Sequence, residues 1–128
     1  MPEKTVAQKL LIKENQRLLV MNTPAEILDA LDPLPGCVHL EVNGADAADA
    51  ILLFAANRAE LEQYLPAVKG RLALKGLLWV IYYKGTSRLK GDIHRDSINA
   101  FAHEIGLEGV AMISVNEELS ALRLKVVG

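Results

Sequence analysis

Cysteine is nearly absent from this sequence, which excludes the proteins that depend on it. Cys37 is the only cysteine in 128 residues, so the chain can form neither an internal disulfide nor a metal cluster held by several thiolates. No apolar run approaches the length of a membrane span. The amino-terminal stretch MPEKTVAQKLLIKENQ mixes lysine and glutamate with apolar side chains, unlike a signal peptide. These absences predict a reduced, cytoplasmic setting.

Aromatic residues and surplus positive charge are also scarce. Aromatic side chains make up 5% of the sequence, and the formal net charge is −2. Proteins that bind nucleic acid normally need a basic surface, and many also stack bases on aromatic rings. We therefore expect nucleic acid to be an unfavourable partner, with any such contact confined to a local basic segment.

A further absence concerns glycine after the first predicted strand. The stretch RLLVMNTPAEIL, residues 17–28, passes from a strand into a helix without the glycine-rich turn that holds a phosphate in Rossmann-like domains. Thr23 and Glu26 can instead satisfy each other's backbone amides as a capping box, and Pro24 suits the first helical position because it has no amide hydrogen. We therefore expect no nucleotide-type cofactor.

The residues that are present favour a layered α/β fold. Hydrophobic residues make up 51% of the chain, enough for the core of a single domain over residues 1–128. Short β-type runs alternate with helical patterns, as in parallel βαβ units. Strands are expected at residues 18–21, 37–42, 50–56 and 76–83. Helices are expected at residues 5–12, with Val6, Leu10 and Leu11 inward, at 24–31, at 58–74 after an Asn57 cap, and from an Asp92 cap to Gly106.

The end of the chain predicts a hairpin. Residues 110–115 and 121–127 are β-type segments joined only by NEELS, which is too short for a crossover helix, so they should pair antiparallel. Residues 50–56 and 76–83 are apolar throughout, as expected of strands covered on both faces. The expected fold is a three-layer Rossmann-like sheet, mostly parallel, that ends in an antiparallel hairpin. Its predicted core includes Leu52, Leu53, Phe54, Leu78, Val80 and Ile81.

The most polar loop, KGTSRLKGD at residues 84–92, is the candidate binding site. It leaves the carboxyl end of a buried strand and enters a helix, which is the side of an α/β sheet where ligands bind. Its cations, hydroxyls and flexible glycines suit a small anion such as phosphate or carboxylate. The candidate anion-binding residues are Lys84, Thr86, Ser87, Arg88, Lys90 and Arg95. The alternative is a solvated loop whose cations pair with Asp92, Asp96 and nearby acids.

No catalytic or metal site is predicted. His94 and His103 would lie on opposite faces of their helix. Asp46 and Asp49 are close in sequence but lack a third ligand nearby. The serines have no base at a recognisable spacing, and there is no nucleophile-elbow pattern.

Two resemblances follow from these patterns. Strands linked by helices and followed by a hairpin resemble the later part of a class I methyltransferase sheet. That family's cofactor site requires a glycine-rich loop and an acid after the second strand, and only the acid has a candidate here, Glu41. This likeness is one of layout, and fold does not imply function.

The second resemblance extends over nearly the whole chain. The segments AQKLLIKENQRLLVMNTP, AILLFAANRAELEQYLPAVKGRL, GLLWVIYYKGTSRLKGDIHRDSI and NEELSALRL resemble a family of small bacterial proteins of unassigned function. Tyr83 replaces a proline usual in that family, and Glu118 replaces a tryptophan. The positions that match its polar loop and helix start are Lys84, Thr86, Ser87, Lys90, Asp92, Arg95 and Asp96. The resemblance implies a fold and a cytoplasmic setting, but no activity.

The functional expectation is accordingly a non-enzymatic Rossmann-like module that binds a protein partner or a small anion. The alternative is an enzyme or cofactor-binding protein whose site lies at the carboxyl ends of the strands, around Lys84–Lys90. Contact of the same loop with RNA or DNA is a third possibility, disfavoured by the charge and the scarcity of aromatic residues.

Overall fold

The computed structural model describes residues 9–23, 39–42, 48–84, 93–115 and 119–126. Along the chain its elements are β1 (Arg17–Met21), β2 (His39–Val42), β3 (Ala48–Phe54), α3 (Arg58–Lys69), β4 (Leu72–Tyr83), α4 (Arg95–Glu104), β5 (Leu107–Ser114) and β6 (Leu119–Val126). In the part of the chain that is described, no helix has both the length and the apolar character needed to cross a membrane.

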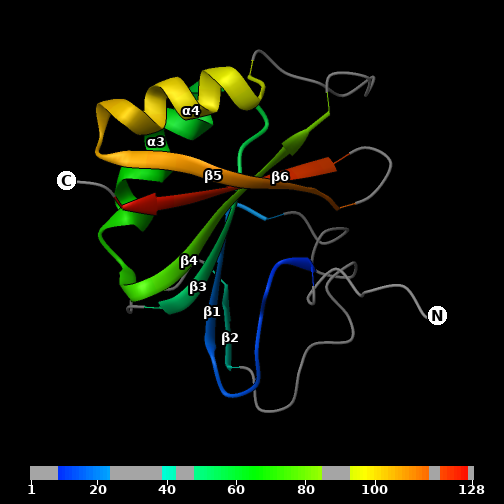
Figure 1. Ribbon diagram of the computed structural model, residues 1–128, viewed down its shortest axis with the longest axis vertical. Coiled ribbons are helices and arrows are strands. Elements are labelled where there is room, and N and C mark those ends of the chain that lie inside the picture. Colours follow the sequence, from blue (N-terminus) through cyan, green and yellow to red (C-terminus); the bar gives the residue numbers. More distant parts are fainter. Residues whose placement is uncertain (1–8, 24–38, 43–47, 85–92, 116–118, 127–128) are drawn as a thin grey trace.

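The strands form one mixed sheet in the order β2-β1-β3-β4-β6-β5 (Figure 1). The first four strands are parallel neighbours, whereas β6 runs antiparallel to both β4 and β5. The prediction of a mostly parallel Rossmann-like sheet with a terminal antiparallel hairpin is therefore confirmed.

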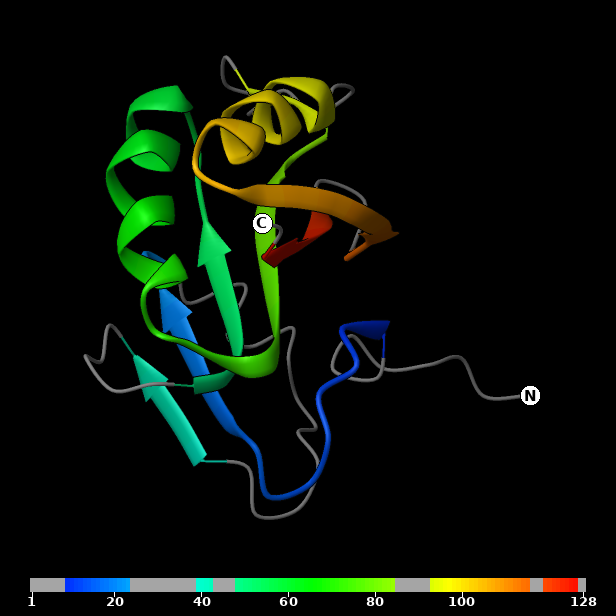
Figure 2. The ribbon, with the colours of Figure 1, turned by 60° about the vertical axis from the view of Figure 1, so that its left-hand side comes forward.

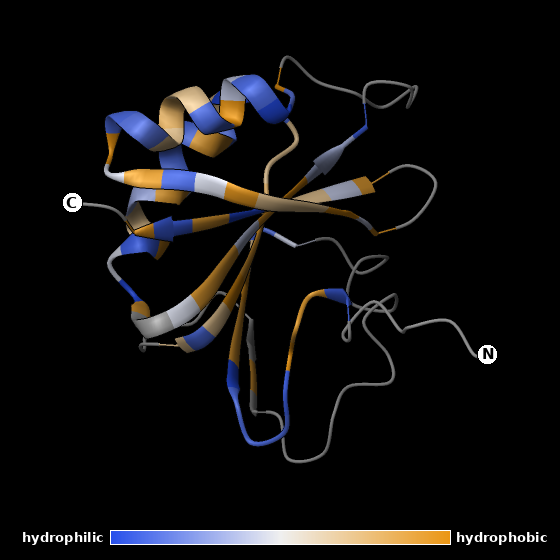
Figure 3. Cartoon of the chain, in the orientation of Figure 1, coloured by the Kyte–Doolittle hydropathy of each residue, from blue (hydrophilic) through white to orange (hydrophobic). Residues whose placement is uncertain are grey.

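Apolar side chains on both faces of the central strands divide the core in two. On one face, α3 and α4 cover a cluster that includes Leu53, Leu78 and Val80. On the other face, Leu52 and Ile81 belong to a cluster that also contains residues of the amino-terminal segment. Figure 2 shows that segment on the opposite side of β3 and β4 from α3, and Figure 3 shows the apolar character of the central strands. All six predicted core residues are buried.

Helix α3 begins where the sequence predicts but ends earlier. Asn57 is the N-cap, and its side chain accepts a hydrogen bond from the Glu60 amide at 2.9 Å. The helix tolerates Pro66 and ends at Lys69 rather than near residue 74, because Gly70 is its C-cap. Leu72, expected in the helix, instead pairs with Ala48, so β3 and β4 both begin earlier than predicted.

Two further expectations need correction. Helix α4 begins at Arg95, because the backbone of His94 is extended and its side chain caps the helix. Asp92, the predicted N-cap, lies outside the described residues. Ile105 is the C-cap in place of the predicted Gly106, which follows it with a left-handed backbone (φ 80°). In the amino-terminal segment Leu10 is buried as expected, but Leu11 is 40% exposed. Val6 and the predicted helix at residues 24–31 lie outside the described residues.

Trp79 fixes the amino-terminal segment to the sheet. Its side chain is 1% exposed, and its indole Nε1 donates to the Leu10 carbonyl at 2.9 Å. A buried hydrogen bond of this kind satisfies two groups that would otherwise lose their hydration without compensation.

We predict that Trp79→Phe lowers the free energy of unfolding by about 1–3 kcal/mol, because it leaves the Leu10 carbonyl without its donor and removes part of a packed ring. Urea unfolding followed by circular dichroism measures this, since the variant has no tryptophan left to report fluorescence. Tyr64→Phe, a change at a partly buried ring packed beside the other core cluster, is the control. A loss no larger than that of the control would contradict the role of the bond.

Candidate functional site

Polar side chains from three strands meet at the carboxyl edge of the parallel strands. Strand β4 ends at this edge, β6 begins there because it is antiparallel, and β5 ends there. In register, Tyr82 lies beside Ser120, and Ser120 lies beside Ser114. Lys84, just after β4, donates from Nζ to Ser114 Oγ at 2.7 Å. The register of the hairpin therefore places a row of hydroxyl groups next to a lysine.

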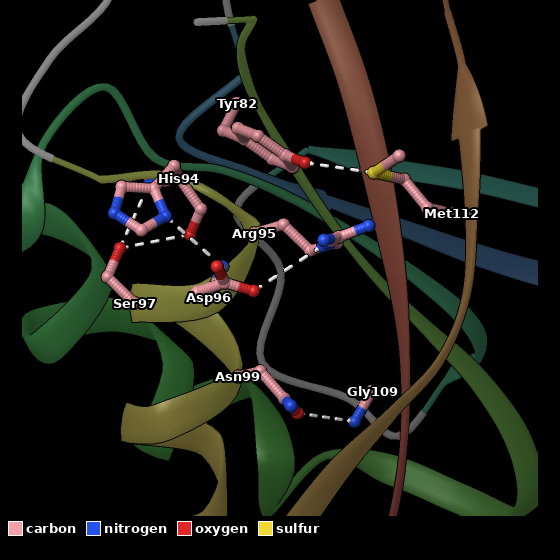
Figure 4. A network of polar contacts seen from close by, with 8 residues as sticks. All are labelled: Tyr82, His94, Arg95, Asp96, Ser97, Asn99, Gly109 and Met112. Carbon is pink, nitrogen blue, oxygen red and sulfur yellow. Dashed lines mark hydrogen bonds and ion pairs between the residues drawn. The ribbon is translucent and has the colours of Figure 1, made fainter.

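The row is partly buried. Ser120 is only 7% exposed, and Tyr82 is 4% exposed. The Tyr82 hydroxyl donates to Met112 Sδ at 3.2 Å (Figure 4) and also forms a hydrogen bond with Ser120. Among the described residues, no buried side-chain nitrogen or oxygen lacks a hydrogen-bond partner.

A cavity of about 430 Å³ opens beside this row. Strands β4, β5 and β6 form one side, and the start of α4 forms the other (Figure 4). Its lining consists of Tyr82, Lys84, His94, Arg95, Asp96, Met112 and Ser120. Two cations, one carboxylate, one imidazole and two hydroxyls therefore share the space with a thioether.

The start of α4 is already capped by its own side chains. His94 Nδ1 accepts from the Asp96 amide at 3.2 Å, and the His94 amide donates to Ser97 Oγ at 2.8 Å (Figure 4). His94 therefore occupies the Asp96 amide, which an anion in the cavity would otherwise be able to use. Arg95 extends from this turn and lies 3.5 Å from Asp96, with both side chains more than half exposed.

The predicted anion-binding residues can now be placed. Lys84 and Arg95 line the same cavity, as the anion-site hypothesis requires. Thr86, Ser87, Arg88 and Lys90 lie outside the described residues. Sequence reasoning missed Tyr82, Ser120 and Met112, which reach the site only through strand register; a predicted register for the terminal hairpin could have indicated them. No group of three potential metal-ligating residues occurs in the described part of the chain.

A second point of interest lies where the carboxyl ends of β1 and β3 adjoin. The chain leaves β1 toward β2 on one side and returns to β3 on the other, which is the topological switch point of such a sheet. Asn22 follows β1 with a left-handed backbone (φ 56°), a conformation that glycine usually supplies. Its Nδ2 donates across the junction to the Phe54 carbonyl at 2.9 Å.

The predicted capping box begins at this point. Thr23 Oγ1 donates to the Met21 carbonyl at 3.0 Å, while Pro24 and Glu26 lie outside the described residues. Asn22 Nδ2 and Thr23 Oγ1 thus both donate to backbone carbonyls of the protein. Glu41, the candidate ribose ligand, lies in β2 at the edge of the sheet.

Comparisons with known proteins identify the fold. No known protein family and no curated protein matches the sequence. Among solved structures, the chain is similar to a ribosomal protein L11 methylase from Lactobacillus delbrueckii subsp. bulgaricus, with a TM-score of 0.64, 10% identity, and coverage of 96% of this chain and 75% of the methylase. It is also similar to an S-adenosylmethionine-dependent methyltransferase from Clostridium acetobutylicum, with a TM-score of 0.58, 10% identity, and coverage of 96% and 87%. DhpI, solved in complex with SAH, gives a TM-score of 0.64 at 10% identity over 95% of this chain and 83% of DhpI.

These similarities show a class I methyltransferase fold. The expected likeness of layout is therefore confirmed for the fold, and the similarity at this level of identity shows nothing about the reaction or ligand.

Burial of Tyr82 makes the stability of the folded protein depend on whether its hydroxyl is ionised. Desolvation raises the pKa of Tyr82 above its ordinary value of 10.0; Arg95 opposes this shift and Asp96 adds to it. Because the folded-state pKa exceeds the unfolded one, the stability that the neutral phenol contributes is complete below the unfolded pKa and is lost as pH rises through the folded pKa.

We therefore expect the free energy of unfolding to fall more steeply above about pH 10 in the wild type than in Tyr82→Phe, which has no phenol to ionise. Urea unfolding between about pH 8 and pH 11 provides the measurement, and Tyr64→Phe is the matched control. If the free energies of unfolding of the wild type and Tyr82→Phe fell in parallel with pH, Tyr82 would have the same pKa in the folded and unfolded states, which would contradict the prediction.

Proposed function

We propose that this chain is a binding module with a class I methyltransferase fold, and that the cavity at the carboxyl end of β4 takes a small molecule carrying one anionic group. The observation that carries this proposal is that Lys84 and Arg95, which lie on either side of residues 85–92 in the sequence, line one cavity. The proposal also includes membership of the bacterial family that the sequence resembles, without the glycine-rich cofactor loop.

The size and lining of the cavity indicate the kind of ligand. A volume of about 430 Å³ lies within the usual range of small-molecule sites, roughly 300–1,000 Å³. A lone phosphate would leave most of this space unfilled. Met112 offers an apolar surface beside the cations, so a carboxylate or phosphate ester with an organic body suits the cavity better than a free inorganic anion.

Charge sets a further limit. Asp96 lies beside Arg95 and offsets part of its positive charge, and the His94 imidazole already occupies the Asp96 amide. The remaining attraction depends on Lys84 and Arg95, each of which can form charge-assisted hydrogen bonds. A monoanion is therefore favoured over a dianion, which Asp96 would repel more strongly.

Titration with benzoate, followed by amide chemical shifts, tests this site. We expect saturable shifts at residues 82–84 and 93–96, with a dissociation constant of about 1 mM, equivalent to roughly −4 kcal/mol. The double variant Lys84→Ala, Arg95→Ala should lose them. Lys125→Ala is the control, because Lys125 is an exposed lysine on β6 that pairs with Glu108 at 3.8 Å, away from the cavity lining. Unchanged wild-type shifts, or equal shifts in the double variant, would exclude the site.

The second candidate is an enzyme or cofactor-binding protein that uses the same edge of the sheet. It is favoured by the similarity to methyltransferases and by Asn22, whose left-handed backbone supplies the turn for which a glycine is usual. Under the first proposal adenosylmethionine does not bind at this edge, because Asn22 and Thr23 direct their polar groups into the protein.

We expect calorimetric titration with adenosylmethionine to show no binding, since the turn after β1 offers no glycine-rich approach to a cofactor. The same titration with a verified methyltransferase serves as the positive control. A dissociation constant in the low micromolar range, equivalent to a binding free energy of about −8 kcal/mol, would support the second candidate and contradict the first proposal.

A further inference from the structure

Strand β5 is an exposed edge of the sheet. It pairs with β6 on one side, and no other described strand adjoins it. An edge strand presents backbone N–H and C=O groups that face away from the sheet, and natural proteins often protect such edges with charged residues, proline or a β-bulge. The first half of β5 has such features, because Glu108 is charged and the pairing with β6 is irregular near Gly109. A register shift between Gly109 and Ala111 leaves Ala111–Ser114 as its regular stretch.

A groove runs between this edge strand and α4. A second cavity, of about 250 Å³, lies between α4 and β5 and shares Arg95, Asp96 and Met112 with the first cavity. Figure 1 shows α4 lying alongside β5. The two cavities therefore adjoin at these three residues, beside the regular stretch of the strand, and together they are called the groove here.

The groove has an apolar part and a positively charged end. Val110 and Met112 line it and are 39% and 48% exposed. At the Ser114 end, Lys84 bonds to Ser114 Oγ and Arg95 lines the adjoining cavity, so this end stays positive although Asp96 offsets part of the Arg95 charge. A partner with an acidic group at that end and an apolar group next to it would match both features.

We propose that β5 is a docking edge for an extended acidic segment of another protein, which adds to the sheet as an antiparallel strand. The antiparallel direction follows from the slightly greater stability of antiparallel pairing. Side chains directly opposite each other share a face of the sheet, so an aspartate or glutamate opposite Ser114 lies next to Lys84. Two residues further along the partner, an apolar side chain lies opposite Met112. Main-chain bonds supply affinity, and these side chains supply selectivity.

This proposal does not depend on the small-molecule function of the cavity. A labelled peptide of sequence Gly-Ser-Asp-Thr-Val-Thr-Ser, titrated with the full chain and followed by fluorescence polarisation, tests it. We expect saturable binding in the micromolar range. Replacing the aspartate of the peptide by lysine should weaken binding by about tenfold, because the groove end is positively charged.

Two variants of the chain separate the edge from other surfaces. Met112→Lys places a charge in the groove and should weaken binding by about tenfold. Val126→Lys places the same charge on another exposed apolar residue, 55% exposed on β6, and should leave binding unchanged. Arg95→Glu should reverse the preference of the groove, so that the lysine peptide binds better than the aspartate peptide. Unchanged far-ultraviolet circular dichroism establishes that each variant is folded.

Backbone pairing has its own test. N-methylation of the valine removes the peptide amide that would donate to Met112, whose backbone faces away from β6 because Val115 donates to Leu119 and successive strand residues alternate in direction. This change should weaken binding if the peptide adds as a strand, whereas N-methylation of the flanking threonines, whose amides face away from β5, is the control. Equal binding of the aspartate and lysine peptides, equal losses in Met112→Lys and Val126→Lys, or no binding by the wild type would overturn the proposal. Sedimentation showing a wild-type dimer that Met112→Lys dissociates would also overturn it, because a second copy would then cover the edge.

Discussion

The antiparallel pairing of β6 with β4 is the constraint on which the candidate site depends. Parallel strands alone would bring only their own carboxyl ends to this edge, whereas the reversed strand brings its beginning there and, through the hairpin, the end of β5. Ser120 and Ser114 consequently lie in register with Tyr82. The pairing also satisfies the buried phenol of Tyr82, whose burial without partners would cost about 1–3 kcal/mol. The same contacts therefore stabilise the hairpin and form the wall of the cavity.

Helix α4 completes the site because its carboxyl end and its middle are tied to different elements. At its carboxyl end, the Lys69 ammonium donates to the Ile105 carbonyl and links α3 to α4. In its middle, Asn99 Oδ1 accepts from the Gly109 amide at 2.9 Å. A Cβ atom at Gly109 would lie 3.0 Å from that oxygen, so the close approach of helix and strand depends on glycine here. These contacts fix the start of the helix, and with it Arg95, over the edge of the sheet.

The sequence was most informative where a pattern depends on local periodicity, and least where it depends on a distant partner. Uninterrupted apolar runs predicted both buried central strands, because a strand covered on both faces has no polar side. The start of β4 could not be predicted in this way, since Leu72 becomes part of the strand by pairing with Ala48. The start of α4 was missed because an imidazole acts as the cap, whereas the usual preference is for Asp, Asn, Ser or Thr. For the site, Lys84 was predicted from charge near a strand end and Arg95 from the resemblance to the bacterial family, but Ser120 required the register.

Asn22 shows that a turn without glycine can still have the backbone conformation that the fold needs at the end of β1. The left-handed backbone that such a turn needs is present, with φ 56°, because asparagine tolerates this conformation better than most residues. Glycine would also leave open the space beside the backbone, into which a cofactor could fit. Here that space carries an amide side chain that bonds to the Phe54 carbonyl and links β1 to β3. Asn22 therefore supplies both the left-handed turn and a bond between two neighbouring strands, whereas glycine could supply only the turn.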